Sequence, residues 1–293
     1  MPSTDADRPA SEAASPGHAV PSTAVGGSAS EASGRGGPST PGDRPAGPES
    51  RPPVFLSDPA ALAADVVVLD GPEGRHAAMV RRLGVGERAD LTDGAGLVAE
   101  CVVTATGAGT LQLRVLARRS EPRPDPALVV AQALPKGDHG PLAVDLMTEG
   151  GVDVIVPWAA QRCVTRWAGE RGDRALARWR AAAAQAAKQS RRAWLPEVTG
   201  PVTTAELAQR VAKASMAVLL DPAGPVTLGA LDFPAAGDIM LIVGPEGGVT
   251  QAEAQELARA GAVTARLGPT VLRTSSAGLA AAAIVASRCG RWS

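Results

Sequence analysis

The chain has 293 residues, 29 basic and 30 acidic side chains, and a formal net charge of -1. Apolar residues make up 45% and charged residues 20%, which is typical of a globular protein with enough chain to build a core. The three cysteines exclude a disulfide-stapled secreted fold, and no stretch approaches the roughly 18 unbroken apolar residues of a membrane helix. We therefore expect no membrane partner, and because no apolar signal segment opens the sequence, we expect a cytoplasmic protein.

The first part of the sequence differs in composition from the rest. Pro, Gly, Ser and Ala account for 34 of residues 1–50, and acidic residues outnumber arginines six to three there. Such a segment buries too little apolar surface to offset the entropy lost on ordering, so we predict a disordered tail over residues 1–52. Residues 51–293 then carry a net charge of +2, from 26 basic and 24 acidic residues.

A small β-rich domain is predicted over residues 53–121. Short apolar runs alternate with turn residues such as Asp93-Gly94, and one helical stretch covers residues 72–83. This pattern is typical of a small barrel, which a stiff linker containing Pro122, Pro124 and Pro126 follows. The predicted strands are 54–56, 66–69, 89–91, 97–103 and 111–116.

A second domain of a different kind is predicted over residues 126–293. Continuous apolar runs alternate with helical segments, which indicates strands buried on both faces and hence a parallel α/β sheet. The predicted strands are 128–134, 152–156, 216–220, 239–243 and 263–267. The clearest predicted helices are 141–149, 174–192, 251–260 and 275–287.

Positive charge gathers between Trp158 and Trp194, where nine basic residues face only Glu170 and Asp173. Basic residues interleaved with tryptophans favour binding to a phosphate backbone with stacking of bases. The alternative is a solvated helix face with Trp179 in the core. A second basic group on the small domain suggests a composite RNA surface; its members are Arg75, His76, Arg81, Arg82 and Arg88.

The most informative loop is Gly244-Pro245-Glu246-Gly247-Gly248, which follows a buried strand and precedes a helix with Thr250 as its expected N-cap. Loops at the carboxyl ends of strands are where open α/β sheets bind ligands, and glycine lets a ligand approach the backbone closely. No Gly-Lys-Ser/Thr follows, and no G-x-G-x-x-G occurs in the chain, so phosphate-loop and dinucleotide motifs are excluded. The alternative is a tight turn, with Glu246 as a first-turn carboxylate favoured by the helix dipole rather than a hydrogen-bond acceptor for a ligand.

Two further loops also follow strands. One is Asp221-Pro-Ala-Gly224, and the other runs from Leu267 through Gly268 to Arg273, before a helix of small residues. Arg273 has no acidic partner within reach on its helix, so it caps a carbonyl, pairs with a distant acid, or meets an anionic substrate.

In this order, the DPAG, GPEGG and LGPTVLRT loops resemble the cofactor site of the SPOUT class of RNA methyltransferases. More narrowly, residues 54–292 resemble the 16S rRNA (uracil-N3)-methyltransferase family, described as RsmE-like. Each motif is weak alone, but the ordered set is specific. The other motifs that agree are Gly71–Leu83 with His76 and Arg81-Arg82-Leu83, Gly86, Asp93-Gly94, Leu134–Asp138, Glu149–Val152, Pro157, Arg162-Cys163, Gln189–Arg192 and Pro196-Glu197.

The resemblance implies an N-terminal PUA-like barrel for RNA and a C-terminal SPOUT domain with a deep trefoil knot. It implies S-adenosyl-L-methionine as cofactor, a homodimer with the active site at the subunit interface, and methylation of a uridine N3 in 16S rRNA within the assembled small ribosomal subunit. The expected cofactor-binding residues are Leu220, Pro222, Val243, Gly244, Pro245, Glu246, Gly247, Gly248, Leu267, Gly268, Val271, Leu272 and Arg273.

Arg273 is the expected catalytic residue, because a cation would stabilise negative charge developing on the uracil ring. Arg192 is the second candidate, on substrate phosphate or base, and the general base is unassigned. The expected RNA-binding residues are Arg75, His76, Arg81, Arg82, Lys136, Arg162, Arg166, Arg191 and Arg192.

Several positions depart from the common family pattern. A Glu-Thr-Ala after the LRT motif is Ser275-Ser276-Ala277 here, and a glutamate before Gln-Ser is Lys188. The other departures are Pro141, Leu146 and Gly150. Two rival functions are a non-catalytic RNA-binding or ribosome-assembly factor and a knotted methyltransferase acting on tRNA. No metal site is expected, because the cysteines lack ligand spacing; Cys101 and Cys163 are expected in the core.

Overall fold

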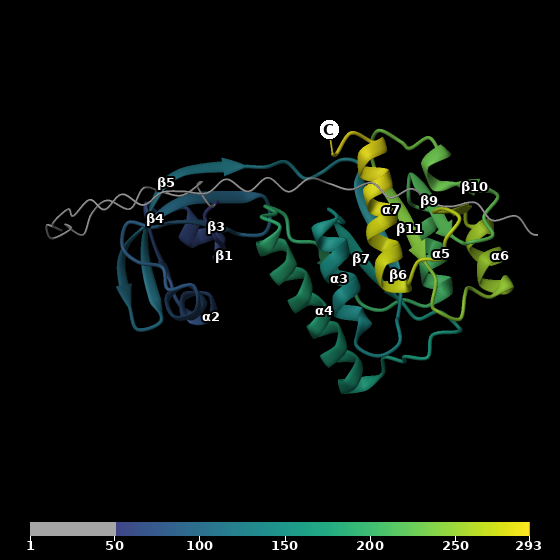
Figure 1. Ribbon diagram of the computed structural model, residues 1–293, viewed down its shortest axis with the longest axis horizontal. Helices are drawn as coiled ribbons and strands as arrows, with labels where there is room; N and C mark the ends of the chain where they lie inside the picture. The colour runs from purple at the N-terminus through teal and green to yellow at the C-terminus, as the bar shows by residue number, and fades with distance from the viewer. Residues whose placement is uncertain (1–50, 293) are drawn as a thin grey trace, which may run out of the picture. The chain divides into compact units, whose positions relative to one another are not determined.

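The computed structural model describes residues 51–292, so the predicted tail lies outside the described residues except for Arg51 and Pro52. Ser50–Ser293 forms one compact unit. It contains a five-stranded sheet formed by the N-terminal part of the described chain and a seven-stranded sheet formed by the rest (Figure 1).

The five-stranded sheet has the order β1-β3-β4-β5-β2. β1 pairs with β3 in parallel, and the other neighbours are antiparallel. Within the described residues β1 and β2 do not pair, so backbone hydrogen bonds do not close the expected barrel. The strands are β1 (Val54–Leu56), β2 (Val66–Leu69), β3 (Arg88–Thr92), β4 (Leu97–Gly107) and β5 (Thr110–Ser120).

Short helices connect these strands. The helix predicted over residues 72–83 is found as α2 (Gly71–Arg75), which continues into the π-helix η1 (His76–Val80). The four-residue helix α1 (Pro59–Leu62) was not predicted; Asp58 caps it by accepting a hydrogen bond from the Ala60 N–H. A core that includes Phe55, Leu91 and Leu113 fills the space between these elements.

The seven-stranded sheet has the order β10-β12-β9-β11-β6-β7-β8, and every neighbouring pair is parallel. All residues of β6 are buried, as expected for a strand covered on both faces. The predicted parallel α/β sheet is thus confirmed, and only the two-residue edge strands β8 and β10 were not predicted. The strands are β6 (Ala127–Ala133), β7 (Val154–Trp158), β8 (Glu197–Val198), β9 (Met216–Leu220), β10 (Val226–Thr227), β11 (Asp238–Val243) and β12 (Val263–Arg266).

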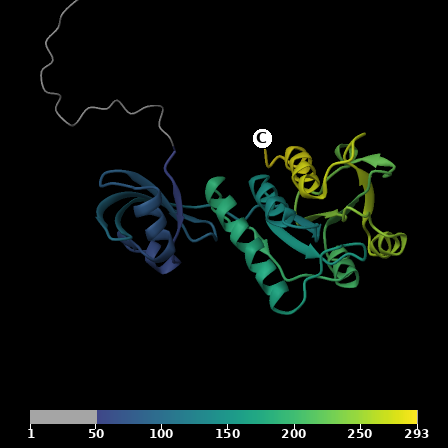
Figure 2. The same cartoon turned by 60° about the horizontal axis from the view of Figure 1, so that its bottom comes forward.

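Helices cover both sides of this sheet (Figure 2). α3 packs against α4 and α7, and α5 packs against α6. α4 begins and ends earlier than predicted, and its end is followed by Arg191 in the left-handed conformation with φ 58°. The helical elements are α3 (His139–Glu149), α4 (Gly169–Gln189), α5 (Thr204–Val211), the short 3-10 helix η2 (Leu228–Ala230), α6 (Gln251–Arg259) and α7 (Thr274–Arg288).

The segment after α4 contacts the five-stranded sheet directly. The Gly96 N–H donates to the Ala193 carbonyl at 3.0 Å, and the Leu195 N–H donates to the Gly94 carbonyl at 2.9 Å. The indole of Trp194 donates to the Glu121 carbonyl at 2.9 Å. A Cβ at Gly96 would lie 2.8 Å from the Trp194 ring, so glycine is needed for this approach.

Candidate active site

Three loops meet at one edge of the seven-stranded sheet. β9, β11 and β12 are parallel neighbours, so their carboxyl ends point the same way. The DPAG loop follows β9, the GPEGG loop follows β11, and the segment 267–273 follows β12. In the sequence 19 and 18 residues separate successive loops, and the order of the strands brings the loops together.

A cavity of about 260 Å³ lies between these loops, and we call it the cofactor cavity. All expected cofactor residues line it except Gly247 and Arg273. Five lining residues were not predicted, namely Asp221, Val249, Thr270, Thr274 and Ala277. They neighbour the predicted loops in the sequence or, like Ala277, lie in the first turn of α7.

The chemistry of the cofactor cavity fits a cationic ligand with an apolar part. Asp221 and Glu246 are the charged residues that line it, and no Lys or Arg is among the lining residues of the described chain. Val271 and Leu272 leave 76% and 39% of their surface exposed, so apolar side chains are available beside the cavity. A sulfonium cofactor that carries an adenine base has both properties.

The GPEGG loop is held by hydrogen bonds from two distant segments. The Lys136 N–H donates to Glu246 Oε1 at 3.2 Å, and Arg162 Nη1 donates to the Gly247 carbonyl at 3.0 Å. α6 begins only at Gln251, so the interpretation of Glu246 as a first-turn carboxylate is wrong. Its carboxylate instead ties the loop to the residues that follow β6.

The first-turn carboxylate of α6 is Glu253, in a capping box with Thr250, which confirms Thr250 as the N-cap. Glu253 is buried and also accepts hydrogen bonds from the Gln161 N–H at 2.8 Å and from Thr204 Oγ1 at 2.9 Å. Burial alone would raise the pKa of Glu253, but these hydrogen bonds outweigh it, and the pKa lies below its ordinary value.

Arg273 is the N-cap residue of α7 and is exposed. It does not line the cofactor cavity, although its neighbours Leu272 and Thr274 do. Within residues 51–292 its guanidinium has neither a carboxylate partner nor a capped carbonyl. Two of the three roles considered for it, capping and pairing with a distant acid, therefore have no support, and an anionic substrate is left as the expected partner.

Arg192, expected to contact substrate phosphate or base, has its partners inside the fold. Its guanidinium forms an ion pair with Asp153 at 2.8 Å and donates to the Thr148 and Val152 carbonyls. Its side chain is only 12% exposed, and burial lowers its pKa while Asp153 opposes the shift. Arg291 binds both oxygens of the same carboxylate. These partners all belong to the fold, and they occupy three of the five N–H donors of Arg192.

Gly247 also differs from expectation. A Cβ at this position would lie 3.3 Å from Arg162 Cβ, and Gly247 does not line the cofactor cavity. A larger side chain there would press on Arg162 rather than enter the cofactor cavity. Gly268 is the loop glycine whose Cβ would meet no atom within 4 Å.

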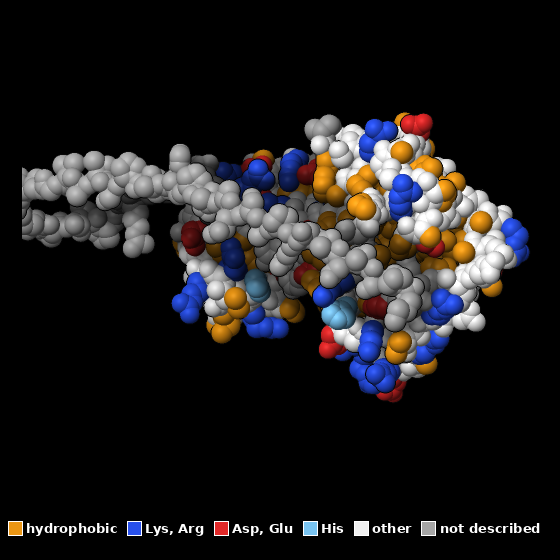
Figure 3. Space-filling model, turned by 45° about the vertical axis from the view of Figure 1, so that its right-hand side comes forward, with side chains coloured by type: hydrophobic (Ala, Val, Ile, Leu, Met, Phe, Trp, Pro, Cys, Tyr) orange, Lys and Arg blue, Asp and Glu red, His pale blue; other side chains and the backbone are white. Residues whose placement is uncertain are grey.

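Several residues of the basic stretch have partners inside the fold. Trp158 is fully buried and presents no face for base stacking, and the half-buried Trp194 packs on Gly96. Lys188 is buried and forms an ion pair with Glu73 at 2.7 Å. Figure 3 shows Lys and Arg side chains dispersed over the visible face rather than gathered in one area.

The other expected RNA-binding residues fall into separate groups. His76, Arg81 and Arg191 line a small cavity of about 80 Å³ where η1 approaches the end of α4. Arg75 and Arg82 are exposed on the N-terminal part, with Arg82 in the left-handed conformation at φ 54°. Lys136 and Arg166 line a different cavity, described below. Arg162 is committed to the GPEGG loop.

The cysteines and possible metal ligands were also located. Cys101 and Cys163 are buried as expected, and burial raises the pKa of the Cys101 thiol to about 11. Among residues 51–292, no three His, Cys, Asp or Glu side chains are arranged to hold a metal ion. In the same part of the chain, no helix combines the length and apolar character needed to cross a membrane.

Comparisons with known proteins agree with this geometry. The family model for the RNA methyltransferase domain matches residues 122–286, and the model for the RNA methyltransferase PUA domain matches residues 69–116. Ribosomal RNA small subunit methyltransferase E of Mycobacterium bovis is 47% identical over 243 residues, which cover 82% of this chain and 93% of the relative.

Two solved structures are similar in fold. One is a methyltransferase from Legionella pneumophila in complex with the cofactor SAM, with a TM-score of 0.74 and 25% identity, covering 81% of this chain and 98% of the other. The second is ribosomal RNA small subunit methyltransferase E from Neisseria gonorrhoeae bound to S-adenosyl methionine, with a TM-score of 0.71, 27% identity and the same coverage. From the domain matches and the 47% identity over most of both chains, this chain belongs to the family of ribosomal RNA small subunit methyltransferase E.

Proposed function

We propose that the protein transfers a methyl group from S-adenosyl-L-methionine to N3 of a uridine in 16S rRNA of the small ribosomal subunit. The observation that carries the proposal is the cofactor cavity, in which three loops of the family motif set converge at the carboxyl edge of a parallel sheet. Membership of the methyltransferase family and the SAM-bound structural neighbours support the same cofactor.

The residues of the DPAG, GPEGG and 267–273 segments hold the cofactor in this proposal. When bound, the cofactor supplies an already activated sulfonium methyl, so the protein has to position it and manage one proton. Asp221 and Glu246 place negative charge beside the cavity, which favours a cationic sulfonium. The side chains of Val271 and Leu272 offer apolar surface to the adenine.

Arg273 is the proposed catalytic residue. Uridine N3 is a poor nucleophile until its proton leaves, and the ring and its oxygens then carry negative charge. An exposed guanidinium beside the cofactor cavity, without an acidic partner in the described chain, is suited to stabilise that charge. Arg192 is not proposed for catalysis, because its guanidinium is largely buried and bonds to Asp153 and two carbonyls of the fold.

The N-terminal part is proposed as a PUA-like RNA-binding domain over residues 53–121, joined to a SPOUT domain over residues 126–293 with a trefoil knot. Arg75, His76, Arg81 and Arg82 are its proposed RNA contacts. The match of residues 69–116 to the PUA domain of RNA methyltransferases supports this assignment. Membership of the family supports the rRNA substrate and action in the cytoplasm, where ribosomal subunits are assembled.

A homodimer with the active site at its interface is also proposed. Val271 and Leu272 beside the cofactor cavity are apolar and exposed, and Leu142 on α3 is 48% exposed. Burying them against a second copy would remove this apolar surface from water. Sedimentation velocity of the full chain should give a dimer, and a monomer at micromolar concentration would refute this part of the proposal.

The test of the function is methyl transfer from labelled S-adenosyl-L-methionine to small subunits from a strain that lacks the endogenous activity, followed by nucleoside analysis. Label in N3-methyluridine is the expected result. Label in another nucleoside, or transfer to tRNA, would overturn the substrate. Absence of label with intact folding and RNA binding would favour the non-catalytic factor.

A further inference from the structure

A second cavity, of about 430 Å³, lies beside the loops that follow β6 and β7. We call it the tryptophan pocket. Its volume is within the range of small-molecule sites, and it shares no residue with the cofactor cavity. The residues that line it come from segments 135–141 and 164–179; those used below are Lys136, Asp138, Arg166, Trp167, Arg171 and Arg178.

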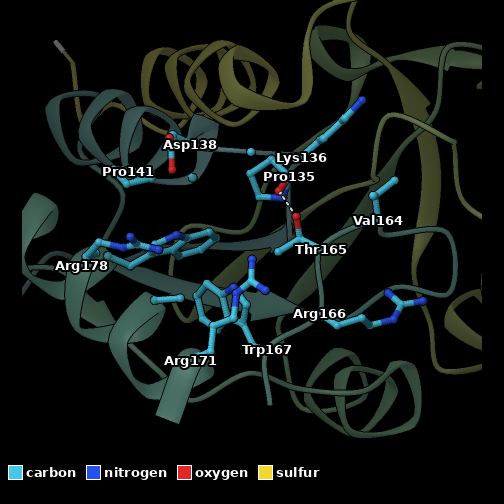
Figure 4. A pocket seen from close by; sticks show the side chains of 14 residues that line it. Pro135, Lys136, Asp138, Pro141, Val164, Thr165, Arg166, Trp167, Arg171 and Arg178 are labelled. Atoms are coloured by element: carbon cyan, nitrogen blue, oxygen red, sulfur yellow. Dashed lines mark hydrogen bonds between the residues drawn. The ribbon is translucent and has the colours of Figure 1, made fainter. Parts of the chain in front are cut away.

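The charge of this pocket is strongly positive. Four cations line it against the single carboxylate of Asp138. Arg166 donates to the Ala160 and Gln161 carbonyls, and Figure 4 shows Arg166 and Lys136 extending away from the centre of the group. Arg171 and Arg178, both on α4, have no ion-pair partner among residues 51–292. Two guanidinium groups are therefore available to an anion.

Two tryptophans in contact with each other form one side of the pocket. Trp167 packs edge-to-face on the buried Trp179, with ring centroids 5.0 Å apart and an interplanar angle of 82°. Trp167 itself is half-buried, and Figure 4 shows it beside Arg171. Thr165 Oγ1 donates to the Pro135 carbonyl at 2.7 Å, so the two loops that border the pocket are bonded to each other (Figure 4).

The pocket lies on the same edge of the sheet as the cofactor cavity. β6 and β7 are the next strands beyond β11, and their carboxyl ends point the same way. The loop after β6 also contacts the GPEGG loop through the hydrogen bond from the Lys136 N–H to Glu246. A molecule in the tryptophan pocket would thus be held at a set position relative to the cofactor.

We propose that the tryptophan pocket binds one nucleotide of the RNA substrate other than the methylated uridine, with its phosphate on Arg171 and Arg178 and its base against Trp167. Cationic side chains beside an aromatic face are the usual means of holding single-stranded RNA. This inference rests on the proposed rRNA substrate, and it assigns to the pocket the role of setting which uridine reaches the cofactor.

The test compares two double variants with the same loss of charge. Arg171→Ala/Arg178→Ala removes the pocket cations. Arg174→Ala/Arg259→Ala removes two exposed arginines, one on α4 and one on α6, that do not line the pocket. The probe is a single-stranded oligouridylate hexamer, titrated by fluorescence anisotropy. We expect the pocket variant to bind the hexamer at least tenfold more weakly than the wild-type protein does. The affinity of the control variant should differ from that of the wild type by less than twofold.

A second readout locates the contact. A hexamer with one 5-iodouridine, irradiated on the full-length protein, should crosslink to a peptide within residues 164–179, and the pocket variant should lose that crosslink. Calorimetry should give unchanged S-adenosyl-L-methionine binding in both variants. With small subunits as substrate, KM for the subunit should rise in the pocket variant only.

Two outcomes would overturn the inference. These are equal weakening by the control variant and crosslinks outside residues 135–141 and 164–179. The hexamer experiments do not depend on methyl transfer. If the wild-type protein binds the hexamer in the pocket but labels no uridine, the proposed reaction fails and the binding site stands.

Discussion

Two arginines that look equivalent in the sequence have opposite surroundings in the fold. Arg273 is exposed at the start of α7 without an acidic partner in the described chain, whereas Arg192 is largely buried and bonds to Asp153 and two main-chain carbonyls. The sequence shows which residues are cationic but not which of them have a carboxylate partner in the fold. The two side chains should therefore respond differently to removal.

Arg273→Ala should abolish most methyl transfer while leaving cofactor affinity within about tenfold, or roughly 1.4 kcal/mol. The reason is that its side chain lies outside the cofactor cavity but next to it. Single-turnover rates with small subunits and calorimetry with S-adenosyl-L-methionine measure the two effects. Arg259→Ala, on the exposed surface of α6, is the control, and unchanged turnover in Arg273→Ala would remove this residue from the mechanism.

Asp153 is the residue whose loss should cost most stability. It is 6% exposed and pairs with both Arg192 and Arg291, and its Oδ2 also accepts from the Leu128 N–H. Asp153→Ala would leave two largely buried guanidinium groups unpaired, with an expected loss of about 3–5 kcal/mol in the free energy of unfolding. Urea unfolding measures it.

The matched control is Asp232→Ala. Asp232 is fully exposed and lies 3.9 Å from Arg288, so its removal should change the free energy of unfolding by less than about 0.5 kcal/mol. Equal losses of unfolding free energy in the two variants would show that Asp153, with Arg192 and Arg291, contributes no more stability than a surface ion pair.

At the scale of elements, an ion pair between Lys188 on α4 and Glu73 on α2 connects a helix of the seven-stranded sheet to a helix of the five-stranded sheet. Lys188 is buried, and Glu73 also accepts a hydrogen bond from the Leu56 N–H at 3.3 Å. Lys188, which departs from the family pattern, thus has an ion-pair partner, Glu73, in this chain. We infer that its role is packing between the N-terminal part and α4 rather than contact with substrate.

A double-mutant cycle tests this pair. Lys188→Met and Glu73→Gln should each destabilise the protein, with Lys188→Met costing roughly 2 kcal/mol because it leaves a half-buried carboxylate without its cation. The coupling energy should be about 1–2 kcal/mol. Chemical denaturation of the four proteins measures it, and strictly additive effects would show that the pair contributes no interaction energy.

The capping box of α6 makes stability depend on pH. The pKa of Glu253 is lower in the folded protein than the ordinary value of 4.5, so its stabilisation is present above about pH 4.5 and is lost as the pH falls through the folded pKa. The free energy of unfolding should fall with acid more steeply in the wild type than in Glu253→Gln. Glu256→Gln, one turn along α6, is the control and should follow the wild type; parallel curves for all three proteins would contradict the prediction.

At the scale of the whole molecule, both cavities and the loops between them lie along one edge of a single parallel sheet. This follows from the order β12-β9-β11-β6-β7, in which strands far apart in the sequence are adjacent in space. The cofactor cavity takes the loops of β9, β11 and β12, and the tryptophan pocket takes those of β6 and β7.

Residues 1–50 should contribute nothing to the stability of this unit. Their composition offers few apolar side chains larger than alanine to bury. A chain starting at Arg51 should therefore have the same thermal midpoint as the full chain within about 1 °C, by calorimetry. A large drop would show that the segment packs on the rest.

The sequence by itself determined the elements and the loops of this protein. Apolar runs identified the main strands, because burial leaves a local signal. The family resemblance of the glycine loops identified 11 of the 16 residues that line the cofactor cavity. α5 was missed, although the capping box of Thr203 and Glu206 was a local signal that could have found it.

Only the tertiary structure decided which polar groups have partners. Strand order and helix packing pair Arg192 with Asp153 and bury Lys188 and Trp158. They also place Gly247 against Arg162, and they gather Arg171, Arg178 and Trp167 around one pocket. Such contacts join residues dozens of positions apart. Charge and side-chain type are properties of single residues, but the availability of a charge to a substrate is set by the neighbours that the fold brings to it.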